Sequence, residues 1–376
     1  MQDHDLLSHF SIIQDYRQTG KIEHKLTDIL LLVICAVIAG ADGWEEIEDF
    51  GHDRLTWLQE YADFDNGIPS HDTLARVMSL INPQQFQRCF ADWMQSCHTL
   101  TNGEVIAIDG KTLRGSYDKR RRTGAIHMVS AFSTANGVVL GQVKTDEKSN
   151  EITAIPELLK LLSVCGCLVT LDAMGCQKAI AQAILDKEAN YLLAVKGNQK
   201  RLEEAFAKHF PLSHVAQYQG DYFSTIEKAH GREETRFHIV SDVIGDFVAL
   251  SADWPELKTL GVALSFRTAK GEIPENATVR YYISSATLTA KQFADAIRNH
   301  WMIENQFHWR LDVAMGEDDC RIRRDKAAEN LAGIRHIAFN VLNSHKTFKA
   351  GMKRKQKKAA MNTDYLSELL MAKGFS

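Results

Sequence analysis

A series of short apolar segments that begins at Val105 restricts the fold of this chain more than any other feature. Val105–Asp109, Ala125–Thr134 and Val138–Thr145 have the length and composition of β-strands. Asn136-Gly137 lies between the second and third segments, and this dipeptide favours a tight hairpin turn. The pattern therefore predicts a three-stranded meander.

Helices and strands alternate after this meander. The apolar spacing predicts a helix over Glu151–Leu162, a strand over Leu168–Leu171, a helix over Gln177–Lys187 and a strand over Tyr191–Val195. A meander followed by this alternation is the element order of the ribonuclease H-like fold, a mixed-sheet α/β (α+β) architecture, although other α/β folds also form mixed sheets. In that fold the first and fourth strands are neighbours. Asp109 and Asp172, which are 63 residues apart and end these strands, would then lie together.

The regions on either side of this core have a different character. Residues 1–100 are predicted to be helical, with Ser70 and Asn82 as helix caps. The predicted helices there are Lys25–Ala41, Gly43–Tyr61, Ser70–Leu80 and Pro83–Cys97. The apolar stretch Ile29–Ala41 has only 13 residues, which is short for a membrane span and favours a buried helix.

Residues 205–287 are predicted to form a β-rich insertion without a long helix. Phe237–Val240, Gly261–Phe266 and Thr278–Ser284 have strand character. The chain is helical and increasingly basic from about residue 330 to its end. We therefore predict a helical N-terminal domain (1–100) and a ribonuclease H-like domain (101–376) that carries the insertion and a basic helical tail (330–376).

Composition and charge are those of an ordinary globular protein, with 45% apolar and 24% charged residues. The net charge of −4 argues against indiscriminate coating of nucleic acid. Charge is nevertheless uneven, because residues 42–65 hold nine acids and one base while residues 346–358 hold seven bases and no acid. Any contact with DNA would therefore be local.

The N-terminus and the cysteines indicate a cytoplasmic protein. The first residues lack the basic and apolar regions of a signal peptide. Seven cysteines occur, without a C-x-x-C motif, which suits reduced thiols rather than a disulfide framework or a structural zinc site.

Three acids far apart in the sequence are the main candidates for chemistry. Asp109 and Asp172 each end an apolar run, and Glu304 lies in a segment (298–312) that is predicted to be helical. Alone, each has an ordinary interpretation, since Asp109-Gly110 is commonly a turn and Glu304 could be a surface carboxylate. Together they could converge on a pair of divalent metal ions, which would clamp the attacking and leaving oxygens of a phosphodiester. This combination indicates phosphoryl transfer on nucleic acid.

The segment around Glu304 leaves alternatives open. His300, Glu304, His308 and Asp312 recur every four residues in an otherwise aromatic helix, so they need polar partners. A metal site would supply them, and so would ion pairs with nearby arginines. Zinc held by His300, Glu304 and His308 ranks third, because it leaves the two aspartates unexplained. A P-loop is excluded, since its upstream glycine would fall at Val105.

Several long sequence words closely resemble the bacterial H-repeat-associated transposases, a family of insertion-sequence transposases with a DDE catalytic triad. They are IAIDGKTLRGS, TDEKSNEITAIPELL, TLDAMGCQKAIA, YLLAVKGNQ, HGREETR, VRYYISS and RNHWMIENQFHWRLDVAMGEDDCRIRR. Gln14–Gln18 and HDTLARV (71–77) resemble the helical domain associated with that family. The resemblance extends over nearly the whole chain.

This resemblance implies a DDE catalytic domain over residues 101–376, with Asp109, Asp172 and Glu304 as the metal-binding triad. It also implies Mg²⁺ or Mn²⁺, two ions at the site, and double-stranded DNA as partner, both at the element ends and at the target, with a homo-oligomer forming on DNA. Related DDE transposases carry Tyr, Arg and Lys at fixed distances from the last acid. Ile297, His300 and Leu311 occupy those places here. Asp312 is the reserve candidate for the third acid.

Basic residues near the acids are candidates for DNA contact. They are Lys111, Arg114, Lys119, Arg120, Arg121, Arg122, Lys196, Arg298 and Arg310. A further acid-free run comprises Lys346, Lys349, Lys353, Arg354, Lys355, Lys357 and Lys358. Two other functions stay open: a metal-dependent nuclease on the same scaffold that cuts without joining, and a non-catalytic DNA-binding descendant.

Overall fold

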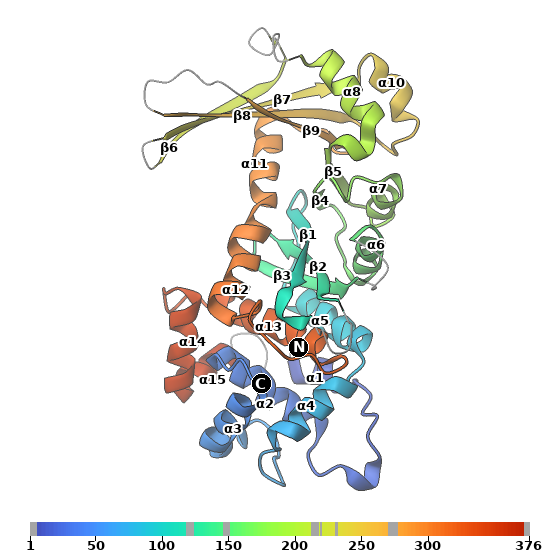
Figure 1. Cartoon of the computed structure of the whole chain (residues 1–376). Helices are drawn as coiled ribbons and strands as arrows, with labels where there is room; N and C mark the ends of the chain where they lie inside the picture. Colours follow the sequence, from blue (N-terminus) through green and yellow to red (C-terminus); the bar gives the residue numbers. More distant parts are fainter. Residues whose placement is uncertain are drawn as a thin grey trace.

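The computed structural model describes residues 6–117, 124–145, 151–211, 218, 220–229, 232–269 and 277–371. In this part of the chain, nine strands form one mixed sheet with the order β3-β2-β1-β4-β5-β9-β8-β7-β6. The molecule is elongated (Figure 1). Strands β6–β9 lie at one end and most N- and C-terminal helices lie at the other, and α11 (Ala290–His300) runs between them. No single helix in the described ranges is long and apolar enough to cross a membrane. Two consecutive helices, α2 (Leu26–Ala39) and α3 (Trp44–Leu58), meet the criteria of length and composition when taken together, but the chain bends by 100° between them.

The first five strands confirm the predicted ribonuclease H-like order. They are β1 (Val105–Leu113), β2 (Ile126–Ser133), β3 (Val138–Lys144), β4 (Leu168–Leu171) and β5 (Asn190–Val195). β1 pairs antiparallel with β2 and parallel with β4, and β4 pairs parallel with β5. Helices α6 (Glu151–Leu161) and α7 (Lys178–Leu185) make the connections. β1 continues four residues beyond the predicted end at Asp109, so the ordinary interpretation of Asp109-Gly110 as a turn does not hold.

The predicted β-rich insertion extends this sheet. β9 (Thr278–Ser284) pairs antiparallel with β5, and β8 (Thr259–Ala269), β7 (Arg232–Asp242) and β6 (Tyr222–Ala229) follow outward. β6 was not predicted, because its polar residues give it no apolar run. Two helices also lie in this region, α8 (Lys200–His209) and the short α10 (Asp246–Ser251).

The N-terminal and C-terminal helices share one hydrophobic core. The N-terminal helices are α1 (Leu6–Phe10), α2 (Leu26–Ala39), α3 (Trp44–Leu58), α4 (His71–Leu80) and α5 (Pro83–Cys97), and the last two are capped by Ser70 and Asn82 as predicted. The C-terminal helices are α13 (Ala327–Ser344), α14 (Met352–Met361) and α15 (Thr363–Met371). α13 packs against α2, α4 and α5, and α2 is buried from Asp28 to Ile38. The described part of the predicted tail, residues 330–371, therefore packs into the core.

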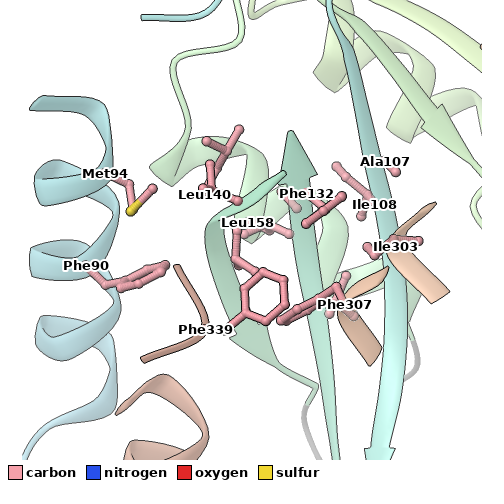
Figure 2. Close-up of a cluster of buried hydrophobic side chains, with 14 of the residues drawn as sticks. Phe90, Met94, Ala107, Ile108, Phe132, Leu140, Leu158, Ile303, Phe307 and Phe339 are labelled. Atoms are coloured by element: carbon pink, nitrogen blue, oxygen red, sulfur yellow. The ribbon is translucent and has the colours of Figure 1, made fainter. Parts of the chain in front are cut away.

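The segment that carries Glu304 is helical but irregular. α11 (Ala290–His300) leads into a π-helix, Ile303–His308, and then into α12 (Trp309–Met315). Ile303 and Phe307 are fully buried on the inner side of the π-helix. Phe307 stacks on Phe132 of β2 with a centroid distance of 5.9 Å and contacts Phe339 of α13 at 5.0 Å (Figure 2). These contacts attach the segment to the sheet.

Replacing Phe307 by Ala is expected to lower the free energy of unfolding by about 3–5 kcal/mol, since it leaves a cavity among Phe132, His336 and Phe339. Urea denaturation measures this loss. Trp309→Ala is the matched control, because Trp309 is 58% exposed and should change stability by no more than about 0.5 kcal/mol. Equal losses in the two variants would contradict the assigned packing.

Candidate active site

Asp109, Asp172 and Glu304 line one cavity of about 150 Å³. The β1–β4 register pairs Ile108 with Leu171, so the residues that follow, Asp109 and Asp172, are neighbours at the same edge of the sheet. The π-helix places Glu304 against β1. Three elements that are distant in sequence thus bring together the three acids that the sequence suggested.

Asp109 is a shielded carboxyl group among other carboxylates. The neighbouring backbone N–H of Gly110 favours its ionised form, and Nδ1 of His308 lies 3.7 Å from its Oδ2. Burial raises the pKa of Asp109 to about 7, and the negative charges of Glu151, Glu304 and Asp172 add to this rise. A nearby cation would therefore strongly favour the ionised form of Asp109.

The local turn after β4 orients Asp172. Its Oδ1 accepts the backbone N–H groups of Met174 at 2.9 Å and Gly175 at 3.2 Å. An aspartate that closes a turn in this way has a restricted rotamer. The turn therefore presents the carboxylate at the cavity without help from a distant residue.

His300 and His308 flank Glu304 as neutral side chains. Burial lowers the pKa of His300 to about 4 and that of His308 to about 3. Nδ1 of His300 shares a hydrogen bond of 2.9 Å with Oγ1 of Thr170, whereas His308 approaches Asp109. They thus face different strands, so zinc binding by His300, Glu304 and His308 finds no support here.

The donor set around the cavity suits Mg²⁺ or Mn²⁺. Among the described residues, no three His, Cys, Asp or Glu side chains form a closed metal cluster. Mg²⁺ rarely uses such a cluster, because it keeps several waters and takes further oxygens from substrate phosphates. Carboxylates from Asp109, Asp172 and Glu304 around an open cavity fit that requirement.

Asp312, the reserve candidate, has a different partner. Nζ of Lys111 lies 2.7 Å from Asp312, 2.9 Å from Glu317 and 3.2 Å from Asp318. The Lys111 side chain is only 11% exposed. This network neutralises Asp312 away from the cavity, so the geometry favours Glu304 as the third acid. The same network favours a structural role for Lys111 over contact with a phosphate.

The other predicted basic residues have varied surroundings. Lys196 lines the acid cavity. Arg298 is bonded to Glu227 at 2.6 Å, Arg310 donates to Asn343 at 2.6 Å, and Arg114 is 82% exposed beside Asp318. Lys119 and Arg120–Arg122 lie outside the described residues.

The basic run after residue 345 does not form one surface. Lys355 is buried, and its Nζ donates to the carbonyls of Leu342 and His345 at the end of α13. Lys358 lies over the rings of Phe348 and Tyr365. Lys349, Lys353 and Lys357 remain exposed.

Sequence reasoning missed Arg280, which projects from β9. Its guanidinium lies 5.2 Å from the centre of the Trp301 ring. Arg280 lines both the acid cavity and a larger cavity of about 860 Å³ between the outer strands and α11. The available signal was the alternation of Thr278, Arg280 and Tyr282 on one face of a predicted strand.

The strand order is that of the ribonuclease H-like fold, and comparisons with known proteins identify the family. The family model "Transposase DDE domain" matches residues 101–341, and the model "DDE_Tnp_1-associated" matches residues 7–94. The chain therefore belongs to the DDE transposase family, as the sequence resemblance predicted.

Curated relatives match along almost the full length. The chain is 58% identical to "H repeat-associated putative transposase YhhI" of Escherichia coli K12, over 99% of both chains. It is 59% identical to "Putative transposase YncI" of Escherichia coli O157:H7, over 98% of this chain and 95% of that one. A piggyBac transposase in a synaptic complex with hairpin DNA aligns with 98% of this chain and 82% of its own, at 11% identity and a TM-score of 0.45. This similarity is too distant to support a conclusion about the fold beyond the strand order described above.

Replacing Lys111 by Met is expected to destabilise the fold by about 3–5 kcal/mol at neutral pH, because it leaves the buried Glu317 without its cation. Burial already raises the pKa of Glu317, and losing Lys111 would raise it further. In the folded variant Glu317 then keeps its proton to a higher pH, whereas in the unfolded chain Glu317 loses its proton above its ordinary pKa of 4.5. The loss should therefore grow as the pH rises from that value through the raised folded-state pKa, and shrink in acid.

Denaturation at several pH values checks this expectation. Lys160→Met is the control, since Lys160 is 67% exposed and its ion pair in the described part of the chain is with the exposed Glu157. If Lys111→Met were as stable as the native protein but bound DNA more weakly, Lys111 would instead be a phosphate contact.

Proposed function

We propose that this protein is a DNA transposase that cleaves the ends of an insertion-sequence-like element and joins them to target DNA. The observation that carries the proposal is the convergence of Asp109, Asp172 and Glu304, from two strand ends and a later helix, on one cavity. Membership of the DDE transposase family supports the same chemistry.

The protein's side chains would hold the metal ions and orient the reacting phosphodiester. Asp109, Asp172 and Glu304 would provide carboxylate oxygens for two Mg²⁺ or Mn²⁺ ions. When bound, such ions stabilise the attacking and leaving oxygens of an in-line displacement. Gly110 and the turn at Met174 and Gly175 orient the two aspartates, so their carboxylates need little rearrangement.

In this proposal, two basic side chains would contact the phosphate of the reacting strand. Lys196 and Arg280 both line the acid cavity. The larger cavity beside it shares Arg280, Tyr282, Ile297 and Trp301, so the two cavities are adjacent. We infer that a DNA strand approaches the acids along the surface between α11 and β6–β9. Related transposases carry an arginine at the position of His300. Arg280 would bind the phosphate instead of that arginine.

Replacing Asp109 by Asn, Asp172 by Asn or Glu304 by Gln should each abolish DNA cleavage and strand transfer, while DNA affinity stays within a few-fold. Each change removes a metal ligand without removing a basic contact. A gel assay with labelled element ends measures cleavage, and a pre-cut end measures joining. Asp312→Asn is the matched control and should retain activity if it folds.

Other outcomes would separate the alternatives. Activity in Glu304→Gln together with its loss in a folded Asp312→Asn would show that the third acid is misassigned. Cleavage by the native protein without joining of a pre-cut end would identify a nuclease. Absence of both activities in the presence of Mg²⁺ and a bound element end would identify a DNA-binding descendant.

The exposed lysines near α14 are the second part of the DNA proposal. Each phosphate neutralised adds about −0.9 to the slope of log K against log salt. Replacing Lys349, Lys353 and Lys357 by Gln should therefore flatten that slope by about 2–3 units. Affinity for specific and non-specific DNA should fall about equally, since phosphate contacts carry little sequence information. Fluorescence anisotropy at several salt concentrations measures both.

A triple variant of Lys160, Lys200 and Lys208 serves as the control. These lysines are also exposed but lie on α6 and α8. An unchanged slope in the α14 variant, or an equal change in the control, would exclude this surface as a DNA contact.

A further inference from the structure

Glu151, the first residue of α6, is an acid near the catalytic cavity that the triad does not include. It lies in the sequence word TDEKSNEITAIPELL, whose polar residues had no assigned role. Its side chain is only 13% exposed. Its negative charge raises the pKa of Asp109 more than that of Glu304 or Asp172 does, which indicates that it is close.

Gly110 explains how Glu151 reaches this position. A Cβ atom at Gly110 would overlap Oε1 of Glu151 and Nε2 of His127, so these atoms occupy the space that a side chain would fill. β1 pairs with β4 only as far as Ile108, which leaves the edge of β1 open beside Asp109 and Gly110. Because α6 packs against β2 and β3, and His127 of β2 bonds Glu151, Glu151 approaches β1 from the β2 side, over the face that Gly110 leaves bare.

His127 holds the Glu151 carboxylate in place. Nε2 of His127 lies 2.8 Å from Oε1 of Glu151, and Nδ1 of His127 lies 2.9 Å from the hydroxyl of Thr112. The consistent proton arrangement has Nε2–H donating to Glu151 while Thr112 donates to Nδ1. Among the described residues this imidazole is the only hydrogen-bond partner of Glu151. Metal-binding carboxylates commonly have such an outer partner that fixes one oxygen.

His308 is a further polar side chain beside Asp109. It is 11% exposed, and its Nδ1 lies 3.7 Å from Oδ2 of Asp109. The carboxylate of Asp109 therefore has both Glu151 and His308 as close neighbours.

We propose that Glu151, positioned by His127, is a fourth carboxylate ligand of the metal site, on the opposite side of Asp109 from Glu304. This inference rests on the proposed metal-dependent function. A fourth carboxylate would add oxygen ligands and negative charge for two divalent ions, together with Asp109, Asp172 and Glu304. Gly110 would then be required for the room it leaves to Glu151.

Mn²⁺ binding to the full-length protein tests the proposal without any measurement of activity. Calorimetry and the rise of the melting temperature with Mn²⁺ concentration give the affinity. Glu151→Gln keeps a hydrogen bond to His127 but removes the charge, and should weaken Mn²⁺ binding at least about tenfold. Glu157→Gln is the matched control on the same helix, with a side chain that is 58% exposed, and should bind Mn²⁺ as the native protein does.

Two further variants test the same proposal in case Glu151→Gln does not fold. Glu151→Asp keeps the charge but shortens the side chain, and should also weaken Mn²⁺ binding. Gly110→Ala should displace Glu151, so adding Glu151→Gln to it should cause little further loss.

The possible failures are distinguishable. Weak Mn²⁺ binding in Asp109→Asn and Asp172→Asn, with native binding in Glu151→Gln and Glu151→Asp, would overturn the role of Glu151 alone. No Mn²⁺ binding by the native protein would overturn both this inference and the proposed metal-dependent function.

Discussion

The attachment of the π-helical segment to the sheet is the interaction on which the site depends. Ile303 and Phe307 are fully buried, and Phe307 packs between Phe132 of β2 and Phe339 of α13. Glu304 and His308 follow these anchors directly in the sequence, so their positions are set by the same packing. A π-helix has i→i+5 hydrogen bonds and a wider turn than an α-helix. Residues four apart therefore drift less around its axis, which helps to keep Glu304 and His308 facing β1.

The central sheet was predictable because its signals are local. Apolar runs bounded by turn residues mark β1 to β5, and the meander followed by alternating helices indicates their order. That order alone places Asp109 beside Asp172, since parallel neighbours end at the same edge. By contrast, β6 consists largely of polar residues on an outer strand, and its pairing with β7 is the evidence for it. The extent of β1 beyond Asp109 was also hidden, because glycine in a strand usually marks a turn or bend.

The charged residues around the site could not be assigned from spacing. Lys111 follows Asp109 closely in a basic stretch, yet its ammonium group is surrounded by Asp312, Glu317 and Asp318, some 200 residues later. Lys355 likewise belongs to a basic run, but its ammonium group donates hydrogen bonds to backbone carbonyls at the C-terminal end of α13. Both lysines pair within the fold, and only long-range packing reveals those partners. Glu151 is the reverse case, an acid without any local motif that the fold brings to Asp109.

The arrangement of acids is electrostatically unfavourable and is held by the apolar core around it. Asp109 is shielded from water beside Glu151, Glu304 and Asp172, so its ionised form is disfavoured in the metal-free protein. Packing of β1 and β2 against Phe307 offsets that cost and keeps the carboxylates from moving apart. Because divalent ions would relieve the repulsion, the same acids that weaken the metal-free fold favour metal binding. Under the proposed metal-dependent function, the stability of this region would therefore depend on metal binding, through carboxylates that an uncharged core holds close together.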